Sequence, residues 1–196
     1  HRDLHSFPTR RSSDLAENVN LPIILYNVPG RTGSNMRAAL TLRIAREIPG
    51  IVAIKEASGD LNQIMEIIAN RPDGFLVYSG DDAMTLSIIA AGGDGCISVV
   101  ANQVPSEFSR MIHAALANDL DLARNLHYKL LRLMNLNFIE SNPIPVKTCL
   151  YMMGLLQNEF RAPMISMTNS SNLQVLHEEL RTLEIAVNDR SAELIA

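Results

Sequence analysis

The stretch Ile51-Val52-Ala53-Ile54-Lys55 decides how the chain is interpreted. It is rich in Ile and Val and lies between Pro49-Gly50 and Ser58-Gly59, a composition that predicts a buried β-strand. Lys55 ends this strand, so its amine is expected where water is scarce. Desolvation favours the neutral form of an amine, and a neutral amine is a nucleophile that attacks carbonyl carbons to form Schiff bases. The stretch therefore predicts both a strand and a reactive group at its end.

Comparable strands recur along the chain. We expect strands at 23–27, 51–55, 75–79 and 95–99, and helices at 37–47, 61–70 and 83–91 between them. This alternation is typical of βα units, which form a parallel sheet with right-handed crossovers. Two folds remain open on this evidence, half of a (β/α)8 barrel or one wing of a doubly wound sheet. Both place functional groups at the carboxyl ends of strands.

The two ends of the chain differ from this middle part. A helix is expected at 106–116, with Ser106 as its N-cap. After residue 118 no strand is expected, and helices are expected at 119–135, 146–156 and 173–187. Residues 1–14 have no apolar core and are not a secretory signal. An Arg- and Ser-rich transit peptide is one interpretation, but HSFPTRRSSDL at 5–15 resembles a translated sequencing adapter. We therefore treat 1–14 as a non-native leader and expect an upstream segment to have been lost.

The composition excludes several classes of partner. The 196 residues are 47% hydrophobic and 19% charged, with a net charge of −4. This balance argues against nucleic acid or an anionic membrane as a partner, and no apolar run approaches the ~18 residues of a membrane span. Cys96 and Cys149 stand far apart, so neither a zinc site nor a disulfide is expected. Two lone cysteines suit the reducing cytoplasm.

Other candidate groups follow the first strand. Tyr26 ends that strand, and a phenol beside a reacting carbonyl can relay protons, although Tyr26 taken alone favours a packing role with a local hydrogen bond. Arg31 follows Pro29-Gly30, and a guanidinium on a rigid turn can hold a carboxylate with two hydrogen bonds. Its alternative is a solvated surface side chain. The amides of Thr32-Gly33 could bind an anion at the start of the next helix.

Two further motifs have simpler explanations. Asp81 and Asp82 could bind a metal, but helix capping explains them better because no histidine lies near them in the sequence. Gly92-Gly93-Asp94-Gly95 lacks dinucleotide-binding spacing and precedes a strand, so it predicts a helix end and a turn. No metal site is therefore expected.

Several motifs together resemble a known family. Tyr26-Asn27-Val28-Pro29-Gly30-Arg31-Thr32-Gly33, followed 22 residues later by Lys55-Glu56-Ala57, resembles the signature of the dihydrodipicolinate synthase family of Schiff-base aldolases. Further landmarks appear in the family's order: Ser79-Gly80-Asp81-Asp82, Gly92-Gly93-Asp94-Gly95 with Ile97-Ser98-Val99, and Asn142-Pro143-Ile144-Pro145-Val146-Lys147. The resemblance extends from about Ala16 to about Leu176.

The resemblance implies a fold and a set of roles. The family has a (β/α)8 barrel followed by a C-terminal helical domain and is usually a homotetramer. By resemblance, Lys55 forms a Schiff base with pyruvate, Tyr26 relays protons, and Arg31 holds the carboxylate of aspartate semialdehyde. Ile97 contacts pyruvate through its backbone carbonyl. The implied reaction condenses pyruvate with aspartate semialdehyde on the lysine and diaminopimelate pathway, with no separate cofactor.

The resemblance also leaves alternatives. A barrel needs eight strands and we count four, so we expect the C-terminal half of a barrel at 15–118 and the helical domain at 119–196. N-acetylneuraminate lyase and related pyruvate-dependent aldolases share the Tyr and the Lys but tend to lack an arginine at the place of Arg31. That arginine favours the synthase. A third interpretation is a catalytically inert fragment.

Overall fold

The computed structural model describes residue 14, residues 16–188 and residue 194. Except for Asp14, the expected leader lies outside the described residues. The described chain divides into two compact units, and the boundary falls between Ile97 and Ser98. We call them the sheet unit and the helical unit and describe each by itself.

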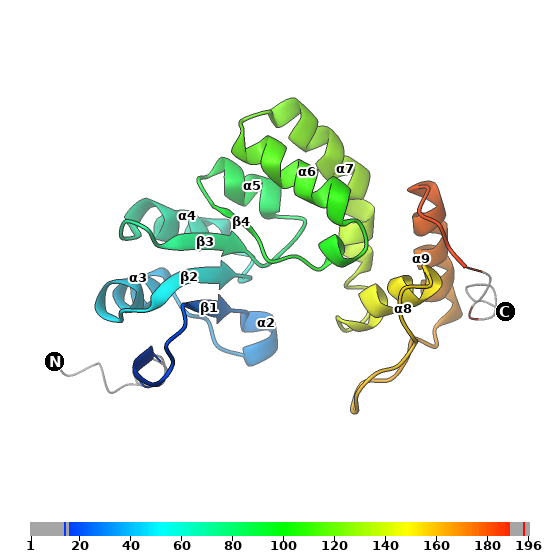
Figure 1. The fold of residues 1–196 in the computed structure, drawn as a ribbon, viewed down its shortest axis with the longest axis horizontal. Coiled ribbons are helices and arrows are strands. Elements are labelled where there is room, and N and C mark those ends of the chain that lie inside the picture. The colour runs from blue at the N-terminus through cyan, green and yellow to red at the C-terminus, as the bar shows by residue number, and fades with distance from the viewer. Residues whose placement is uncertain (1–13, 15, 189–193, 195–196) are drawn as a thin grey trace. The chain divides into compact units, whose positions relative to one another are not determined.

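The sheet unit contains four parallel strands. They are β1 (Ile23–Asn27), β2 (Ile51–Glu56), β3 (Leu76–Ser79) and β4 (Gly95–Cys96), and they lie side by side in that order (Figure 1). This arrangement confirms the predicted βα units. Strand β4 is shorter than predicted because Ile97 makes one last bond to β3, from its amide to Ser79 O at 2.9 Å, before a helical turn begins at Val100.

Four helices connect or follow these strands. They are α2 (Pro29–Thr32), α3 (Ala38–Glu47), α4 (Leu61–Asn70) and α5 (Thr85–Ala90). Asp60 caps α4 as predicted, because its carboxylate accepts the amides of Asn62 and Gln63 at 3.0 and 3.2 Å. Asp81 accepts the amides of Ala83 and Met84 in the turn before α5. The prediction that Asp81 or Asp82 caps this helix is wrong, because α5 begins at Thr85 with Met84 at its N-cap position and no side-chain cap, and Asp81 binds the turn that precedes it.

One face of the sheet packs on the helices. Leu25, Ile54 and Val77 are buried there in one apolar core with Ile44 of α3 and Ile64 of α4. Burying an aliphatic side chain of this size contributes about 1.5–3 kcal/mol. This core fixes which residues of each strand point inward, and so it also fixes which ones point to the opposite face.

Asp94 explains the glycine-rich turn before β4. Its carboxylate accepts the amide of Val77 at 2.7 Å and forms an ion pair with Arg71, whose guanidinium also donates to the carbonyl of Gly92. The motif therefore ties the start of β4 to β3 and α4, as expected of a structural turn.

The helical unit follows a short turn, η1 (Val100–Asn102). It comprises α6 (Pro105–Leu116), α7 (Leu120–Leu136), α8 (Ile144–Met152) and α9 (Ser170–Thr182). The prediction that Ser106 caps α6 is wrong, because the helix begins one residue earlier at Pro105. Proline suits the first helical position, since its fixed φ matches a helix and its missing N–H would be unpaired there. Asp119 caps α7 by accepting the amide of Leu122 at 3.1 Å.

Apolar side chains from all four helices are buried in this unit. They include Met111, Leu130, Leu133, Met152 and Leu176. Leu173, Leu176 and Leu180 of α9 are buried, and α9 packs on α7 and α8. Helix α6 belongs to the same compact unit as α7. The domain boundary expected at 118/119 stays a prediction. No helix among the described residues is both long and apolar enough to cross a bilayer.

Candidate active site at the carboxyl end of the sheet

The strand register brings Tyr26 and Lys55 together. Tyr26 of β1 is the partner of Lys55 of β2, and Lys55 is the partner of Tyr78 of β3. Register partners in a parallel pair point to the same face of a sheet. These three side chains therefore form a row across the sheet, on the face opposite the apolar core.

The amine of Lys55 lies against the ring of Tyr26. Its Nζ is 4.4 Å from the ring centroid, within the range of a cation–π contact. Lys55 is half-buried, whereas Tyr26 is 49% exposed. A primary amine beside a phenol combines a nucleophile with a group that can carry protons. The two residues singled out as catalytic candidates are thus neighbours in space.

Gly80 makes room for the stem of Lys55. A Cβ atom at Gly80 would lie 3.1 Å from Lys55 Cε and 2.7 Å from Ala57 Cβ. The Gly80 amide donates to Glu56 O at 2.7 Å, so the chain after β3 is held close to the end of β2. Sequence reasoning marked Gly80 only as part of a family landmark and missed this contact.

Sequence reasoning also did not single out Tyr78. It lies in the row with Lys55 and is partly buried. Strand parity could have found it, because residues 76 and 78 are out of phase with the inward-pointing Val77. Its neighbour in the row on β4 is Gly95, where no side chain extends the row.

The turn that carries Arg31 is built by its neighbours. Helix α2 is one turn long, and Gly33 ends it in the left-handed region at φ 67°, with its amide donating to Pro29 O at 2.9 Å. The Thr32 amide donates to Val28 O at 3.2 Å, and the Thr32 hydroxyl donates to Ser34 O at 2.9 Å. Both amides therefore donate to backbone carbonyls within the same turn. Arg31 is exposed on this turn.

Ile97 lies just beyond β4. Its amide is bound to Ser79 O, so it sits at the same carboxyl edge of the sheet as Tyr26 and Lys55, and its side chain is 39% exposed. The roles assigned to Ile97, Arg31, Thr32 and Gly33 in substrate binding stay predictions.

Comparison with known proteins decides the family. A sequence model described as the dihydrodipicolinate synthetase family matches residues 12–182. The chain belongs to this family. The 4-hydroxy-tetrahydrodipicolinate synthase of Koribacter versatilis is 51% identical over 174 residues, which are 88% of this chain and 58% of that protein. The chain thus spans little more than half the length of this relative.

Solved structures of the dihydrodipicolinate synthetase family agree. The Aquifex aeolicus enzyme matches with a TM-score of 0.89 at 38% identity, over 93% of this chain and 64% of that one. The chloride-inhibited Acinetobacter baumannii enzyme, complexed with pyruvate, matches with a TM-score of 0.86 at 40% identity, over 90% and 60% of the two chains. These matches confirm the predicted fold, part of a (β/α)8 barrel followed by helices.

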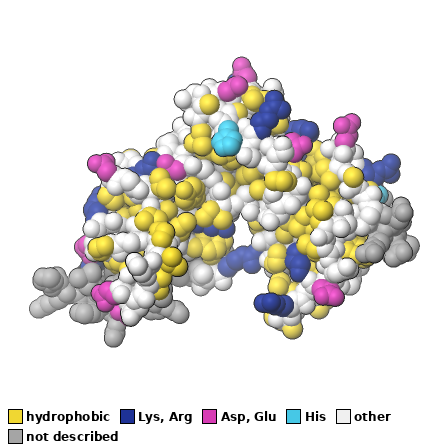
Figure 2. All heavy atoms as spheres, viewed as in Figure 1, with side chains coloured by type: hydrophobic (Ala, Val, Ile, Leu, Met, Phe, Trp, Pro, Cys, Tyr) yellow, Lys and Arg dark blue, Asp and Glu magenta, His cyan; other side chains and the backbone are white. Residues whose placement is uncertain are grey.

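The described residues offer neither a metal site nor a reactive thiol beside the candidate site. Within the described ranges, no three His, Cys, Asp or Glu side chains lie close enough to hold a metal ion. Cys96 is a poor nucleophile because burial, with help from the Asp82 carboxylate, raises the pKa of its thiol to about 12. On the face drawn in Figure 2, acidic and basic side chains are interspersed with hydrophobic and neutral ones.

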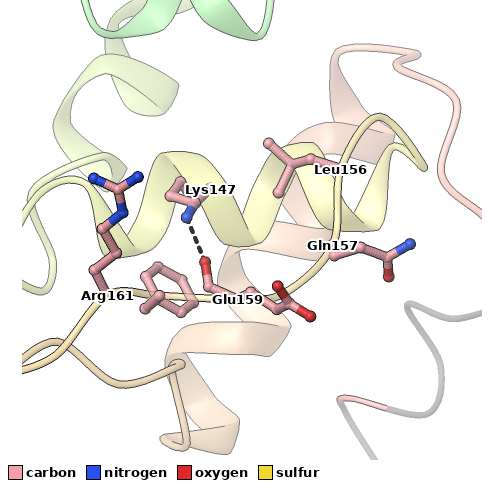
Figure 3. Close-up of a pocket in the computed structure, with 6 residues that line it drawn as sticks. Lys147, Leu156, Gln157, Glu159 and Arg161 are labelled. Carbon is pink, nitrogen blue, oxygen red and sulfur yellow. Dashed lines mark hydrogen bonds between the residues drawn. The ribbon is translucent and has the colours of Figure 1, made fainter.

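The helical unit has an open pocket of about 410 Å³. Its lining residues are Lys147, Leu156, Gln157, Glu159, Phe160 and Arg161. Figure 3 shows Lys147 pointing from α8 to the carbonyl of Glu159, to which its amine donates. The same amine lies 4.6 Å from the ring centroid of Phe160. This lysine is committed to local contacts, and none of the predicted site residues lines the pocket.

Proposed function

We propose that the chain carries the Schiff-base site of a 4-hydroxy-tetrahydrodipicolinate synthase, which condenses pyruvate with aspartate semialdehyde. The observation that carries the proposal is the register pair of Tyr26 and Lys55, with Nζ 4.4 Å from the ring centroid on the face of the sheet away from the core. The names of the relatives and the pyruvate bound to one structural neighbour support it.

Each predicted residue has a role in this reaction. The Lys55 amine attacks the ketone carbon of pyruvate, and loss of water leaves an imine. Tyr26 carries protons to and from the bound substrate. Arg31 pairs with the carboxylate of aspartate semialdehyde, Thr32 and Gly33 shape the turn that presents Arg31, and the carbonyl of Ile97 contacts pyruvate.

The setting of the reaction is part of the proposal. We place it in lysine and diaminopimelate biosynthesis in the cytoplasm, with no metal or separate cofactor and with a homotetramer as the assembly of the full-length family protein. The sheet unit supplies four of the eight strands of a barrel. We therefore assign imine formation to this chain and expect full turnover to need the rest of the barrel wall, because catalysis depends on groups held together.

Borohydride trapping tests this proposal. The chain has three lysines, Lys55, Lys129 and Lys147, so the site of a reduced pyruvate adduct can be assigned by peptide mass spectrometry. We expect the adduct on Lys55 only, and only when pyruvate is present. An adduct spread over all three lysines, or no adduct on the folded chain, would contradict the proposal, and the latter result favours the inert fragment.

Tyr26→Phe tests the proton relay. The variant keeps the ring beside the amine but removes the hydroxyl, so we expect trapping on Lys55 to continue about 100-fold more slowly. Tyr128→Phe is the matched control, because Tyr128 is exposed on α7. The choice of second substrate separates the synthase from the lyase. With the rest of the barrel wall supplied so that turnover is restored, aspartate semialdehyde and N-acetylmannosamine are compared as partners of pyruvate.

A further inference from the structure

A buried carboxylate lies directly behind the candidate site. Glu56 follows Lys55 in β2, points to the opposite face and is 1% exposed. Both of its oxygens accept Asn27 Nδ2 at 3.1 Å, Oε2 accepts Gln63 Nε2 at 3.1 Å, and Oε1 accepts the amide of Ser58 at 2.8 Å. Neutral donors from three parts of the sheet unit thus surround the carboxylate.

Asn27 extends this network to the loop before α3. It follows Tyr26 in β1 and is 2% exposed. Its Oδ1 accepts the amide of Met36 at 2.9 Å, and its Nδ2 also donates to Asn35 Oδ1 at 2.9 Å. Asn35 in turn donates to Gln63 Oε1 at 3.0 Å. No buried side-chain oxygen or nitrogen of Asn27, Glu56 or Gln63 is left without a partner.

The burial of the Glu56 carboxylate at this position needs a physical explanation. Burying a carboxylate is unfavourable unless hydrogen bonds replace its hydration. Two residues earlier on the same face, Leu25 and Ile54 fill the corresponding positions with aliphatic side chains. The polar pair therefore departs from this apolar pattern in the row one residue beyond Tyr26 and Lys55.

We infer that Glu56 and Asn27 are positioning residues that hold Lys55 against Tyr26. The inference rests on the role proposed for Lys55. Asn27 and Glu56 are register partners, one residue beyond the pair Tyr26 and Lys55. Successive strand residues point to opposite faces, so anchoring Glu56 and Asn27 inward directs Lys55 and Tyr26 outward. A one-residue slip of β1 against β2 would turn each side chain to the wrong face, and the side-chain hydrogen bonds across the two strands oppose it.

Backbone contacts continue the same support. The Ala57 amide donates to Asn27 O at 2.9 Å, and the Gly80 amide donates to Glu56 O at 2.7 Å. The ends of β1, β2 and β3 are thus joined around the residue that bears the amine. Moving the Glu56 side chain therefore disturbs the segment that also passes the stem of Lys55.

Variants of the polar pair test the inference. Glu56→Gln places an amide where Asn27, Gln63 and Ser58 all donate, so at least one donor loses its acceptor. Asn27→Asp sets two carboxylates face to face. The double variant restores one donor and one acceptor across the strands. The matched control is Thr41→Val, because Thr41 is fully buried in α3 and its hydroxyl has no hydrogen-bond partner.

Two reactions of Lys55 are measured against pH, with circular dichroism as the check of folding. One is trapping with pyruvate, and the other is reductive methylation with formaldehyde, which needs no substrate site. Lys129 and Lys147 are internal standards. We expect Glu56→Gln and Asn27→Asp to slow both reactions of Lys55 about tenfold and to move their pH profile. The double variant should recover beyond Asn27→Asp alone, and Thr41→Val should match the parent chain.

The outcomes separate this inference from the proposed function. If the folded single variants keep the rate and the pH profile of Lys55 in both reactions, the positioning role is overturned. If the parent chain is methylated at Lys55 but never trapped by pyruvate, the proposed function fails, and methylation still decides whether the pair positions the amine. Should Glu56→Gln not fold, Gln63→Ala keeps the carboxylate but removes its donor on α4, together with the acceptor of Asn35, and should shift the pH profile in the same direction.

Discussion

The two faces of the sheet differ sharply at the carboxyl ends of β1 and β2. On one face Tyr26 and Lys55 lie beside each other, partly open to solvent. On the other face, one residue further on, Asn27 and Glu56 are buried and hydrogen-bonded at each polar atom. The comparison teaches that a candidate catalytic pair and a buried hydrogen-bonded pair can share two short strands, because alternation sends neighbouring residues to opposite faces.

Lys55→Ala should have the largest effect on chemistry. We expect the pyruvate adduct to fall to background because no other amine lies in the row with Tyr26 among the described residues. The free energy of unfolding should change by less than about 0.5 kcal/mol, since the side chain is only half-buried. Trapping and urea denaturation measure the two quantities. A strongly destabilised Lys55→Ala variant would contradict the view that the face of Lys55 contributes to chemistry and the opposite face to stability.

Glu56→Ala should affect stability strongly, in contrast to Lys55→Ala. Removing the carboxylate leaves the buried donors of Asn27 and Gln63 without an acceptor, so we expect a loss of about 3 kcal/mol in the free energy of unfolding. Urea denaturation at neutral pH provides the measurement, and Glu47→Ala on the exposed end of α3 is the control. A loss within error of that control would mean that the network contributes little to stability.

Gly80→Ala tests whether crowding beside Lys55 displaces its amine. The added methyl group would lie 2.7 Å from Ala57 Cβ and 3.1 Å from Lys55 Cε. Overpacking of this kind costs about 1–3 kcal/mol, and the displaced amine should be trapped by pyruvate about tenfold more slowly. Gly30→Ala is the control, because a Cβ at Gly30 meets no atom within 4 Å. Equal trapping of the two variants would show that Lys55 tolerates the crowding.

The smallest expected effect concerns the rate at which the Cys96 thiol is alkylated. Cys96 continues the row of Glu56 and Ser79 onto β4, and burial raises the pKa of its thiol to about 12. A raised pKa keeps the thiol protonated below that pH, so alkylation by iodoacetamide should be slow at pH 8 and should quicken as the pH rises. Mass spectrometry follows the reaction, with the chain in denaturant as the control. Rapid alkylation of the folded chain at pH 8 would show that the thiol is not shielded.

Local sequence signals predicted the bounds of a helix well where a single capping residue determines them. Helix α4 has the predicted bounds, 61–70, because Asp60 supplies a cap that depends only on its immediate neighbours. The end of β4 and the start of α6 were predicted less well. Ile97 leaves the sheet because β3 offers it only one more partner, and the choice between Pro105 and Ser106 depends on how the chain enters the helix.

The site was predicted in part. Tyr26 and Lys55 were singled out because each lies near the carboxyl end of a strand, one residue before the last. Their contact depends on the parallel register that joins those strands. The amides of Thr32 and Gly33 were assigned to an anion, yet a single turn of helix already occupies them. Local sequence shows which donors exist but not which acceptors the folded backbone offers.

The sequence alone determined the βα rhythm, the family resemblance and the choice of Lys55 as the candidate amine, because these depend on short motifs and on their order along the chain. Only the tertiary structure showed that Glu56 and Asn27 form one buried network, that Tyr78 joins the row of Lys55, and that Gly80 must lack a side chain. The reason is physical: these relations join strands that lie 20 or more residues apart, and their distances are set by register and packing.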